Sequence, residues 1–299
     1  MTLMSVSVCI PSYKHPEQLK RLLDSILIQD YKDVHVIITD DTRTDEIKDL
    51  VASYQGLDIT YEKNSTPLGA TGNTIQAMKL AKDGYIKIMH RDDSFATPGS
   101  LRQFVKGLDD DPDSFFFFSG TREVYYEKDG SENREKTYKR AMQEIEEAQL
   151  KDTPDNLFVV NMVGAPSSVI LRDASILPDE KLTWLIDSEL YMHILKDKGK
   201  DAYSFTRDSL INIGHDGDQL TDSCRENAPL MIKDNVYVFN KYGLLSNKNC
   251  RKFLCREAIR NRTGYGSIKA SGISYAEYAM YAFRAFVRRN ILKNKKELC

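Results

Sequence analysis

Two adjacent carboxylates stand directly after a short apolar run in the segment YIKIMHRDDSFATPG (85–99). Asp92 and Asp93 form this pair, and His90 and Arg91 precede it. Adjacent carboxylates can hold a divalent cation, and the cation can in turn neutralise a diphosphate. Asp residues at the ends of strands also shape turns and cap helices, so the pair has a structural interpretation as well.

Two more polar clusters follow apolar runs. PSY (11–13) comes after the run 6–10, and DDTRTD (40–45) comes after the run 34–39. Ligands of open α/β sheets bind outside the carboxyl ends of the strands. If these strands are parallel, both clusters and residues 90–93 lie along one edge of the sheet, which favours a ligand site at that edge.

The sequence lacks the glycine motifs that cradle phosphates. No GxGxxG follows the first apolar run, and no GxxxxGK followed by Ser or Thr occurs, which disfavours dinucleotide and P-loop binding. A phosphate ligand would then need another counter-charge, such as a carboxylate-bound cation. The letters HRD (90–92) also occur in protein kinases, but Thr97 stands where those enzymes have Asn, and no DFG follows. We attribute this match to chance.

The spacing of apolar residues predicts the elements that would position these clusters. Strands are expected at 6–10, 34–39, 58–62, 85–89 and 115–119, and helices at 16–29, 44–54, 70–81 and 98–108. Thr44 is the expected cap of the second helix. This alternation predicts an α/β fold with a single, Rossmann-like, mostly parallel sheet flanked by helices on both faces.

The alternation ends after Gly120. The later elements are expected to be a β-ribbon and polar loop at 121–139, a charged helix near 139–151, a strand at 167–171, a helix at 184–196 and basic helices from about 226. Residues 225–299 hold 16 Lys and Arg against 5 Asp and Glu, a charge of +11, whereas residues 1–224 carry −13. A basic extension on an acidic body suggests an anionic surface as the partner of the extension.

The composition is that of an ordinary globular protein, with 299 residues, 41% of them hydrophobic and 29% charged. The five cysteines contain no CxxC pair, so we expect no zinc site, and reduced thiols in the cytoplasm are the simplest interpretation. We see no secretory signal and no run near the roughly 20 apolar residues that span a bilayer. The expectation is a cytoplasmic protein without a nucleic-acid partner; a homo-oligomer stays open.

Four segments resemble, in order and spacing, the motifs of the inverting glycosyltransferases of family 2, which have the GT-A fold. They are VSVCIPSY, VHVIITDDTRTD, NSTPLGATGN and YIKIMHRDDSFATPGSL. The resemblance continues more weakly through GAPSSVILRD (164–173), WLIDSELYMHIL (184–195) and INIGHDGDQLTD (211–222). It implies a catalytic domain at 1–224, with the nucleotide-sugar part at 1–120 and the acceptor side at 121–224, followed by a helical extension at 225–299.

The resemblance implies roles for the matching positions. The residues expected to bind the nucleotide-sugar donor are Pro11, Tyr13, Asp40, Asp41, Asn73, Arg91 and Asp92. Asp93 is expected to ligate Mn²⁺ or Mg²⁺, with His215 near the metal and the diphosphate. Two positions depart from the family pattern: His90 stands where Asp is common, and Gly72 stands where Arg is common. The role of His90 stays open.

Inverting transfer needs a carboxylate that takes the proton of the acceptor hydroxyl as this hydroxyl attacks the anomeric carbon. LIDSEL (185–190) resembles the family's (E/D)D-x-(D/E)-L pattern, with Asp187 as the base and Ile186 in place of the first acid. The alternative is that Asp187 only caps its helix. Glu189 is the second candidate for the base and an expected acceptor-side residue, and Trp184 would stack on an acceptor sugar or fill the core.

The segment SYAEYAMYAFRAFVRRNILKNKK (274–296) predicts a helix with an apolar stripe and a basic flank. The stripe consists of Tyr275, Tyr278, Ala279, Ala282, Phe283 and Phe286. Such a helix can lie in an anionic membrane interface, which would suit a lipid-linked acceptor. Docking of the stripe on the catalytic domain or on another subunit is an equal alternative.

Together with the expected metal ligands, the resemblance implies a metal-dependent inverting glycosyltransferase. It would move a hexose or N-acetylhexosamine from a nucleotide-sugar donor, with UDP as the expected nucleotide, to a glycan or lipid-linked saccharide in bacterial polysaccharide synthesis. One alternative is a nucleotidyltransferase, which would normally carry a Gly-rich, Arg-containing loop that PSYKHPEQ (11–18) lacks. The other is a non-catalytic sugar-nucleotide-binding module, against which the retention of Asp93 and Asp187 argues.

Overall fold

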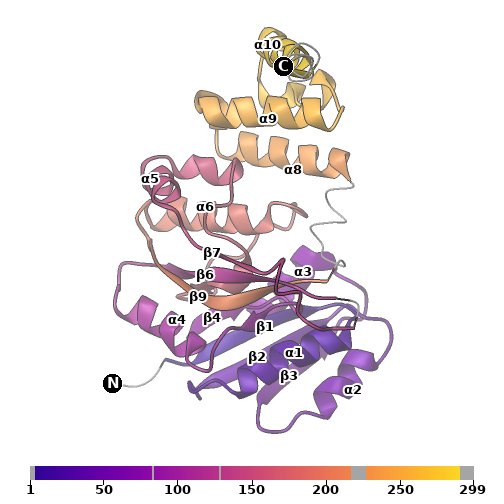
Figure 1. Ribbon diagram of the computed structural model, residues 1–299, viewed down its shortest axis with the longest axis vertical. Helices are drawn as coiled ribbons and strands as arrows, with labels where there is room; N and C mark the ends of the chain where they lie inside the picture. Colours follow the sequence, from indigo (N-terminus) through magenta and orange to yellow (C-terminus); the bar gives the residue numbers. More distant parts are fainter. Residues whose placement is uncertain (1–3, 83, 128, 217–226, 290–299) are drawn as a thin grey trace. The chain divides into compact units, whose positions relative to one another are not determined.

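The computed structural model describes residues 4–82, 84–127, 129–216 and 227–289 (Figure 1). The contacts within the chain divide it into two compact units. The first comprises the described residues of Met1–Pro154, Met162–Leu182 and Ile186–Gln219, and the second those of Asp155–Asn161, Thr183–Leu185 and Leu220–Cys299.

The first unit begins with four parallel strands in the order β3-β2-β1-β4. These strands and the helices that connect them or follow them are β1 (Val6–Ser12), α1 (Pro16–Leu27), β2 (Val34–Asp40), α2 (Glu46–Ala52), β3 (Asp58–Lys63), α3 (Gly69–Lys79), β4 (Tyr85–Ile88) and α4 (Ser100–Asp109). The elements predicted over residues 6–108 are thereby confirmed. The predicted cap Thr44 is wrong: α2 begins two residues later, after Asp45, whose carboxylate pairs with Lys63.

The sheet continues beyond β4 with mixed directions. The added elements are β5 (Ser94–Phe95), β6 (Phe116–Tyr125), β7 (Tyr138–Arg140), α5 (Glu144–Asp152), β8 (Val169–Leu171), α6 (Ile186–Lys198) and β9 (Tyr203–His215). Strand β8 lies antiparallel between β4 and β6, while β9 pairs with β6 in parallel. Strand β7 pairs antiparallel with β6, which confirms the predicted β-ribbon. Figure 1 shows α5 and α6 on one side of the sheet and α1, α2 and α4 on the other.

Helix α1 illustrates how the sequence builds the core. Pro16 occupies its first turn, where a missing N–H is tolerated. Leu19, Leu22, Leu23 and Ile26 recur at helical spacing and are almost completely buried against the sheet. Strands β1 and β2 are buried on both faces, as expected for parallel strands covered by helices. Because β1, β2 and β4 are parallel, their carboxyl ends lie at the same edge of the sheet.

The second unit is helical, as predicted for the basic extension. Its main helices are α8 (Ala228–Lys241), α9 (Lys248–Arg260) and α10 (Tyr275–Val287). Short segments from earlier in the chain pack with these helices: buried Asp234 of α8 accepts hydrogen bonds from the backbone N–H groups of Thr183 and Trp184. No helix in the described part of the chain combines the length and the apolar character needed to cross a bilayer.

The described residues contain no disulfide bond. Cys9, Cys250 and Cys255 are free thiols and are buried. Burial raises the pKa of the Cys9 thiol to about 12, which makes it unreactive. Cys224 and Cys299, the end of the segment 211–222 and the basic run from 290 lie outside the described residues.

Candidate donor and metal site

Three side chains converge where β4 ends. One ligand atom from each of His90, Asp92 and Asp93 lies within 4.8 Å of the other two. Asp93 is 2% exposed, and its Oδ1 accepts a hydrogen bond from the backbone N–H of Gly214 at 3.1 Å. The pair of carboxylates was predicted from the sequence. The structure shows that His90, whose role was left open, belongs to the same group.

The electrostatics of this group suit a bound cation. Burial, and after it the negative charge of Asp92, raises the pKa of Asp93 well above its usual value. Burial lowers the pKa of His90, which favours the neutral imidazole that ligates metals. Two carboxylates and one neutral imidazole therefore form a donor set that fits a divalent cation, and the cation would relieve the repulsion between the carboxylates.

A buried lysine is connected to this group through Ser167. Lys87 of β4 is fully buried, and its Nζ donates to the carbonyl oxygen of Ser167. The hydroxyl of Ser167 accepts the backbone N–H of His90 at 2.9 Å and also hydrogen-bonds with Asp93. Burial lowers the pKa of Lys87, while the charge of Asp93 acts in the opposite direction. Ser167 thus ties the segment before β8 to the end of β4.

Arg21 of α1 also contacts the segment that carries Asp92, and this contact was not predicted from the sequence. Its Nη2 donates to the carbonyl oxygen of Asp92 at 3.2 Å, and its guanidinium lies 4.1 Å from the ring centroid of Tyr126. The carboxylate of Asp216 stands 3.7 Å from Nη2. A Cβ on Gly214 would lie 2.2 Å from the carbonyl oxygen of Asp92, so the close approach of β9 requires glycine.

Unsatisfied polar atoms gather around this site. Among the described residues, buried side-chain atoms without a hydrogen-bond partner include Ser12 Oγ, Gln18 Oε1, Arg21 Nε, Arg91 Nε and Asp216 Oδ1. These atoms belong to the end of β1, to α1, to the segment after β4 or to the residue that follows β9. Buried polar atoms normally have partners, so this concentration is consistent with a site for a polar ligand.

Two of the expected donor contacts, Asp40 and Asp41, hold the loop after β2. Asp40 accepts from the backbone N–H of Thr42 and the hydroxyl of Tyr61. Asp41 accepts from the backbone N–H of Gly69 at 2.8 Å and so secures the start of α3. Both carboxylates are buried. Their observed contacts are structural, and their contact with a nucleotide base stays a prediction.

Of the other residues predicted to bind the donor, Asn73 is buried and Tyr13 is exposed. The amide of Asn73 donates to the carbonyl oxygens of Ser12 and Thr39, so it joins the ends of β1 and β2. Tyr13 is 46% exposed beside half-buried Pro11, and its ring is accessible for contact with a base. Lys14 follows with a positive φ of 58°, a conformation that is uncommon for residues with a side chain.

His215 lies near this site but outside the group of three potential ligands. Its Nε2 lies 2.7 Å from Glu123 Oε2, and its ring stacks on Tyr125 at 4.4 Å between centroids. Burial disfavours the ionised form of Glu123, but hydrogen bonds from His215 and Thr121 outweigh this effect and lower its pKa. The expected contact of His215 with metal or diphosphate stays a prediction.

The two acceptor-side carboxylates of α6 differ in access. Asp187 lies in the first turn and is half-buried, and its Oδ1 accepts the backbone N–H of Ser188. Glu189 is fully buried, and its Oε2 accepts the backbone N–H of Asp179 at 3.3 Å. Only Asp187 of these two has a surface that an acceptor could reach. Trp184 is half-buried and belongs to the second unit.

Comparison with known proteins gives relatives that match about a third of the chain. Over 92 residues it is 34% identical to the Escherichia coli protein named UDP-Glc:alpha-D-GlcNAc-diphosphoundecaprenol beta-1,3-glucosyltransferase WfaP, covering 31% of this chain and 37% of that protein. Over 98 residues it is 33% identical to abequosyltransferase RfbV of Salmonella typhimurium, covering 31% of this chain and 29% of that protein. The chain therefore spans about a third of the length of these curated relatives.

Solved structures share the fold over nearly the whole chain. Mannosyltransferase PcManGT from Pyrobaculum calidifontis, in complex with GDP-Man and Mn²⁺, matches with a TM-score of 0.58 and 13% identity over 98% of this chain and 82% of that one. S. aureus TarS 1-349, in complex with UDP-GlcNAc, matches with a TM-score of 0.56 and 15% identity over 95% of this chain and 81% of that one. At these identities the likeness shows the fold, which is the predicted GT-A fold. The family model described as glycosyl transferase family 2 matches residues 7–169, more than half of the chain, and the chain therefore belongs to this family.

Proposed function

We propose that this family 2 protein is a metal-dependent, inverting glycosyltransferase that moves a hexose or N-acetylhexosamine from a UDP-sugar to a hydroxyl of a glycan or lipid-linked saccharide. The observation that carries the proposal is the group of His90, Asp92 and Asp93 at the carboxyl end of β4. The names of the similar proteins support it: WfaP is named for UDP-Glc and a diphosphoundecaprenol-linked sugar, and the TarS complex holds UDP-GlcNAc.

In the donor half of the site, Asp93, Asp92 and His90 would hold the cation. An imidazole nitrogen beside two carboxylates suits Mn²⁺ better than Mg²⁺, which prefers oxygen ligands alone. When bound, the cation would neutralise the diphosphate leaving group. Exposed Tyr13 would offer its ring to the base, while Arg21 keeps the carbonyl of Asp92 in place.

In the acceptor half, Asp187 would take the proton of the attacking hydroxyl. As the bond from the acceptor oxygen to the anomeric carbon forms, the bond from that carbon to the diphosphate oxygen breaks, and the configuration inverts. The proton moves from the acceptor hydroxyl to a carboxylate oxygen of Asp187. A positioned general base of this kind contributes roughly 10²–10⁴-fold to the rate.

Release of UDP from UDP-glucose and UDP-GlcNAc tests this function. The expected result is UDP release that needs Mn²⁺, stops with EDTA and is absent in Asp93→Ala. Slow hydrolysis by water suffices for the assay, and octyl glycosides or an undecaprenyl-lipid extract should accelerate release. Protection of the protein from melting by UDP without release from any of these donors would contradict an enzyme and indicate a binding module.

We further propose that α10 contacts an anionic membrane surface. Tyr275, Met280, Phe283 and Phe286 of this helix are 65%, 39%, 67% and 60% exposed. Of the predicted stripe, both Tyr275 and Tyr278 contact the ring of Tyr265 within the second unit. An exposed aromatic face on a helix in a basic segment is the pattern of an interfacial helix.

A further inference from the structure

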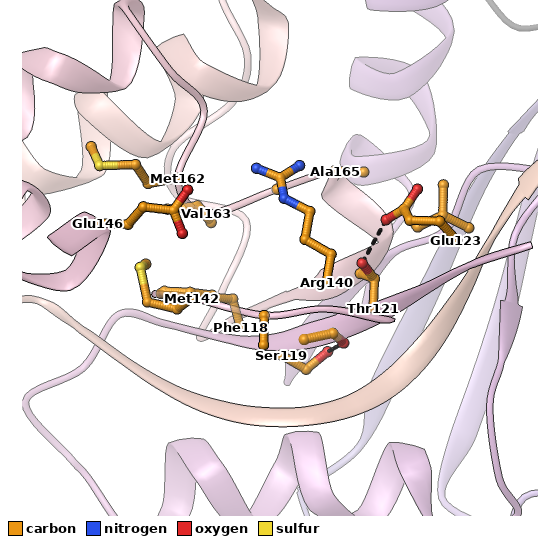
Figure 2. A pocket seen from close by; sticks show the side chains of 14 residues that line it. Phe118, Ser119, Thr121, Glu123, Arg140, Met142, Glu146, Met162, Val163 and Ala165 are labelled. Carbon is orange, nitrogen blue, oxygen red and sulfur yellow. Dashed lines mark hydrogen bonds between the residues drawn. The ribbon is translucent and has the colours of Figure 1, made fainter. Parts of the chain in front are cut away.

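A pocket of about 110 Å³ opens in the first unit next to β6 (Figure 2). Its floor is formed by Ile213 of β9 and by five residues of β6: Phe118, Ser119, Gly120, Thr121 and Glu123. Its walls come from Arg140 of β7, from the residues leading into α5 and from the loop 162–165. Neither the comparisons nor the proposed donor site assigns this pocket a ligand.

Hydrogen bonds and an ion pair connect the pocket to both halves of the proposed chemistry. On the donor side, Glu123 lines the pocket and pairs with His215, which follows Gly214, the residue that donates to Asp93. On the other side, Gly164 lines the pocket, and its carbonyl oxygen accepts the hydroxyl of Tyr191 at 3.2 Å.

Tyr191 lies one helical turn after Asp187 in α6, so the two side chains share a face of the helix. Burial, and after it the charge of Asp187, raises the pKa of Tyr191, which is consistent with their proximity. The contacts of Glu123 and Gly164 therefore link the pocket, through intervening residues, to the proposed metal ligands and to the proposed base. An acceptor must reach the same two places during transfer.

The side chains of the pocket combine apolar walls with a few polar groups. Figure 2 shows the guanidinium of Arg140 between Glu146 on one side and Glu123 on the other, with Met142 and Met162 beside Glu146. Among the described lining residues Arg140 is the single cation against two carboxylates. This excess of negative charge opposes a ligand that carries its own carboxylate or phosphate at this position.

We propose that this pocket binds the reacting sugar of the acceptor and that this sugar is a neutral pyranose; the inference rests on the proposed transferase function. Arg140 supplies donors and Glu146 supplies acceptors for neighbouring hydroxyls, since a guanidinium only donates and a carboxylate only accepts. The side chains of Met142 and Met162 contact the C–H surface of the ring. Apolar walls with a few convergent polar groups are typical of small-molecule sites.

Methyl NMR on protein labelled with ¹³C at the methionine methyl groups tests the pocket directly. The chain has nine methionines, and Met→Leu variants assign the signals of Met142 and Met162. With UDP and Mn²⁺ present, the methyl glycosides of glucose, galactose and N-acetylglucosamine serve as neutral probes, and methyl glucuronide serves as the anionic probe. We expect at least one neutral probe to shift both signals at concentrations at which methyl glucuronide shifts neither.

Two substitutions sharpen this test. Arg140→Met should remove the shifts, whereas Lys139→Met on the same strand should keep them, because neighbouring residues of a strand point to opposite faces. Glu146→Gln preserves the hydrogen-bond acceptor that caps α5 but removes a charge, and should let methyl glucuronide bind.

Failure of the pocket and failure of the proposed function give different results. No shift with any neutral probe, or a larger shift with methyl glucuronide, overturns the pocket inference. Because binding is measured without turnover, that result can stand beside intact Mn²⁺-dependent release of UDP. Loss of UDP release from every donor, by contrast, would reject the transferase itself.

Discussion

At the scale of single residues, Asp93 combines a cost in stability with its proposed role as a metal ligand. It is 2% exposed and adjoins Asp92, and burial and that charge raise its pKa. Since the pKa in the folded state exceeds that of the unfolded chain, the cost in stability grows as the pH rises from the unfolded to the folded pKa and is complete above the folded pKa. The cost vanishes below the unfolded value, about 3.9. A cation that binds the ionised carboxylate would offset it.

Asp93→Asn should therefore stabilise the metal-free protein at pH 7 while removing its response to Mn²⁺. A gain of about 1 kcal/mol would raise Tm by roughly 2–4 °C. The gain should shrink as the pH falls toward 4 and vanish below it, where Asp93 is protonated in both states. Melting curves with EDTA and with Mn²⁺ measure this, with exposed Asp113→Asn as the control. Full Mn²⁺ stabilisation of Asp93→Asn would show that Asp93 does not bind the metal.

Asp187→Asn is the matching change on the acceptor side. Asn is nearly isosteric but cannot take a proton, so transfer should fall by at least ~100-fold while UDP binding stays. Glu189→Gln keeps a side-chain oxygen that can accept the backbone N–H of Asp179, so its turnover should stay near the wild-type value. Glu189→Ala loses this buried hydrogen bond and should lower Tm. Initial rates and melting curves separate the two effects. Normal turnover in Asp187→Asn with loss in Glu189→Gln would move the base to Glu189.

The sequence was informative for residues whose role depends on near neighbours. Asp92 and Asp93 stand together at a strand end, so their pairing could be predicted. The structural contacts of Asp41 could not, because they come from Asn64, Leu68 and Gly69, more than twenty residues away. Long-range hydrogen bonds leave no periodic pattern in the sequence.

At the scale of elements, the parallel half of the sheet was predictable and the other half was not. Buried strands between helices give continuous apolar runs, as in β1 and β2. Strand β9 (Tyr203–His215) was missed because exposed Arg207 and Asp208 interrupt the alternation of polar and apolar residues along it. The antiparallel direction of β8 depends on its partners β4 and β6 rather than on its own three residues.

The contact between β9 and the metal group leads to a prediction about Gly214. In Gly214→Ala the new Cβ would lie 2.2 Å from the carbonyl oxygen of Asp92, so one of the two segments must move. Overpacking of this kind costs about 1–3 kcal/mol, and we expect Mn²⁺-dependent UDP binding to weaken by roughly 10-fold or more. Gly266→Ala, which meets no atom within 4 Å, is the control. Equal UDP affinity in Gly214→Ala and the wild type would show that the packing of β9 against Asp92 does not affect donor binding.

At the scale of the whole molecule, charge divides along the chain. Residues 1–224 carry −13 and residues 225–299 carry +11, although the net charge is only −2. Each Lys or Arg near an anionic leaflet can add about 1 kcal/mol of attraction, which salt screens. The exposed aromatic residues of α10 lie in the basic part, so this part has both the charge and the apolar surface that the proposed membrane contact needs.

The protein should therefore float with vesicles that contain phosphatidylglycerol, and less with phosphatidylcholine alone. Binding should weaken in high salt but keep a residual apolar component. Replacing Phe283 and Phe286 by Glu should abolish flotation, whereas Ile145→Glu, at a 65% exposed position of α5, should not. Absence of flotation at low salt would end the membrane proposal. A change of oligomeric state in the Phe283 and Phe286 variant would then indicate contact between copies of the chain.

The most direct test of the central claim is calorimetric titration of UDP into the protein with Mn²⁺, with Mg²⁺ and with EDTA, in the wild type and in Asp93→Ala. The group of His90, Asp92 and Asp93 predicts binding that is tightest with Mn²⁺, weaker with Mg²⁺ and lost with EDTA. Asp93→Ala should lose the metal-dependent part while the protein stays folded. Equal UDP affinity with and without metal, or unchanged Mn²⁺-dependent affinity in Asp93→Ala, would contradict the account.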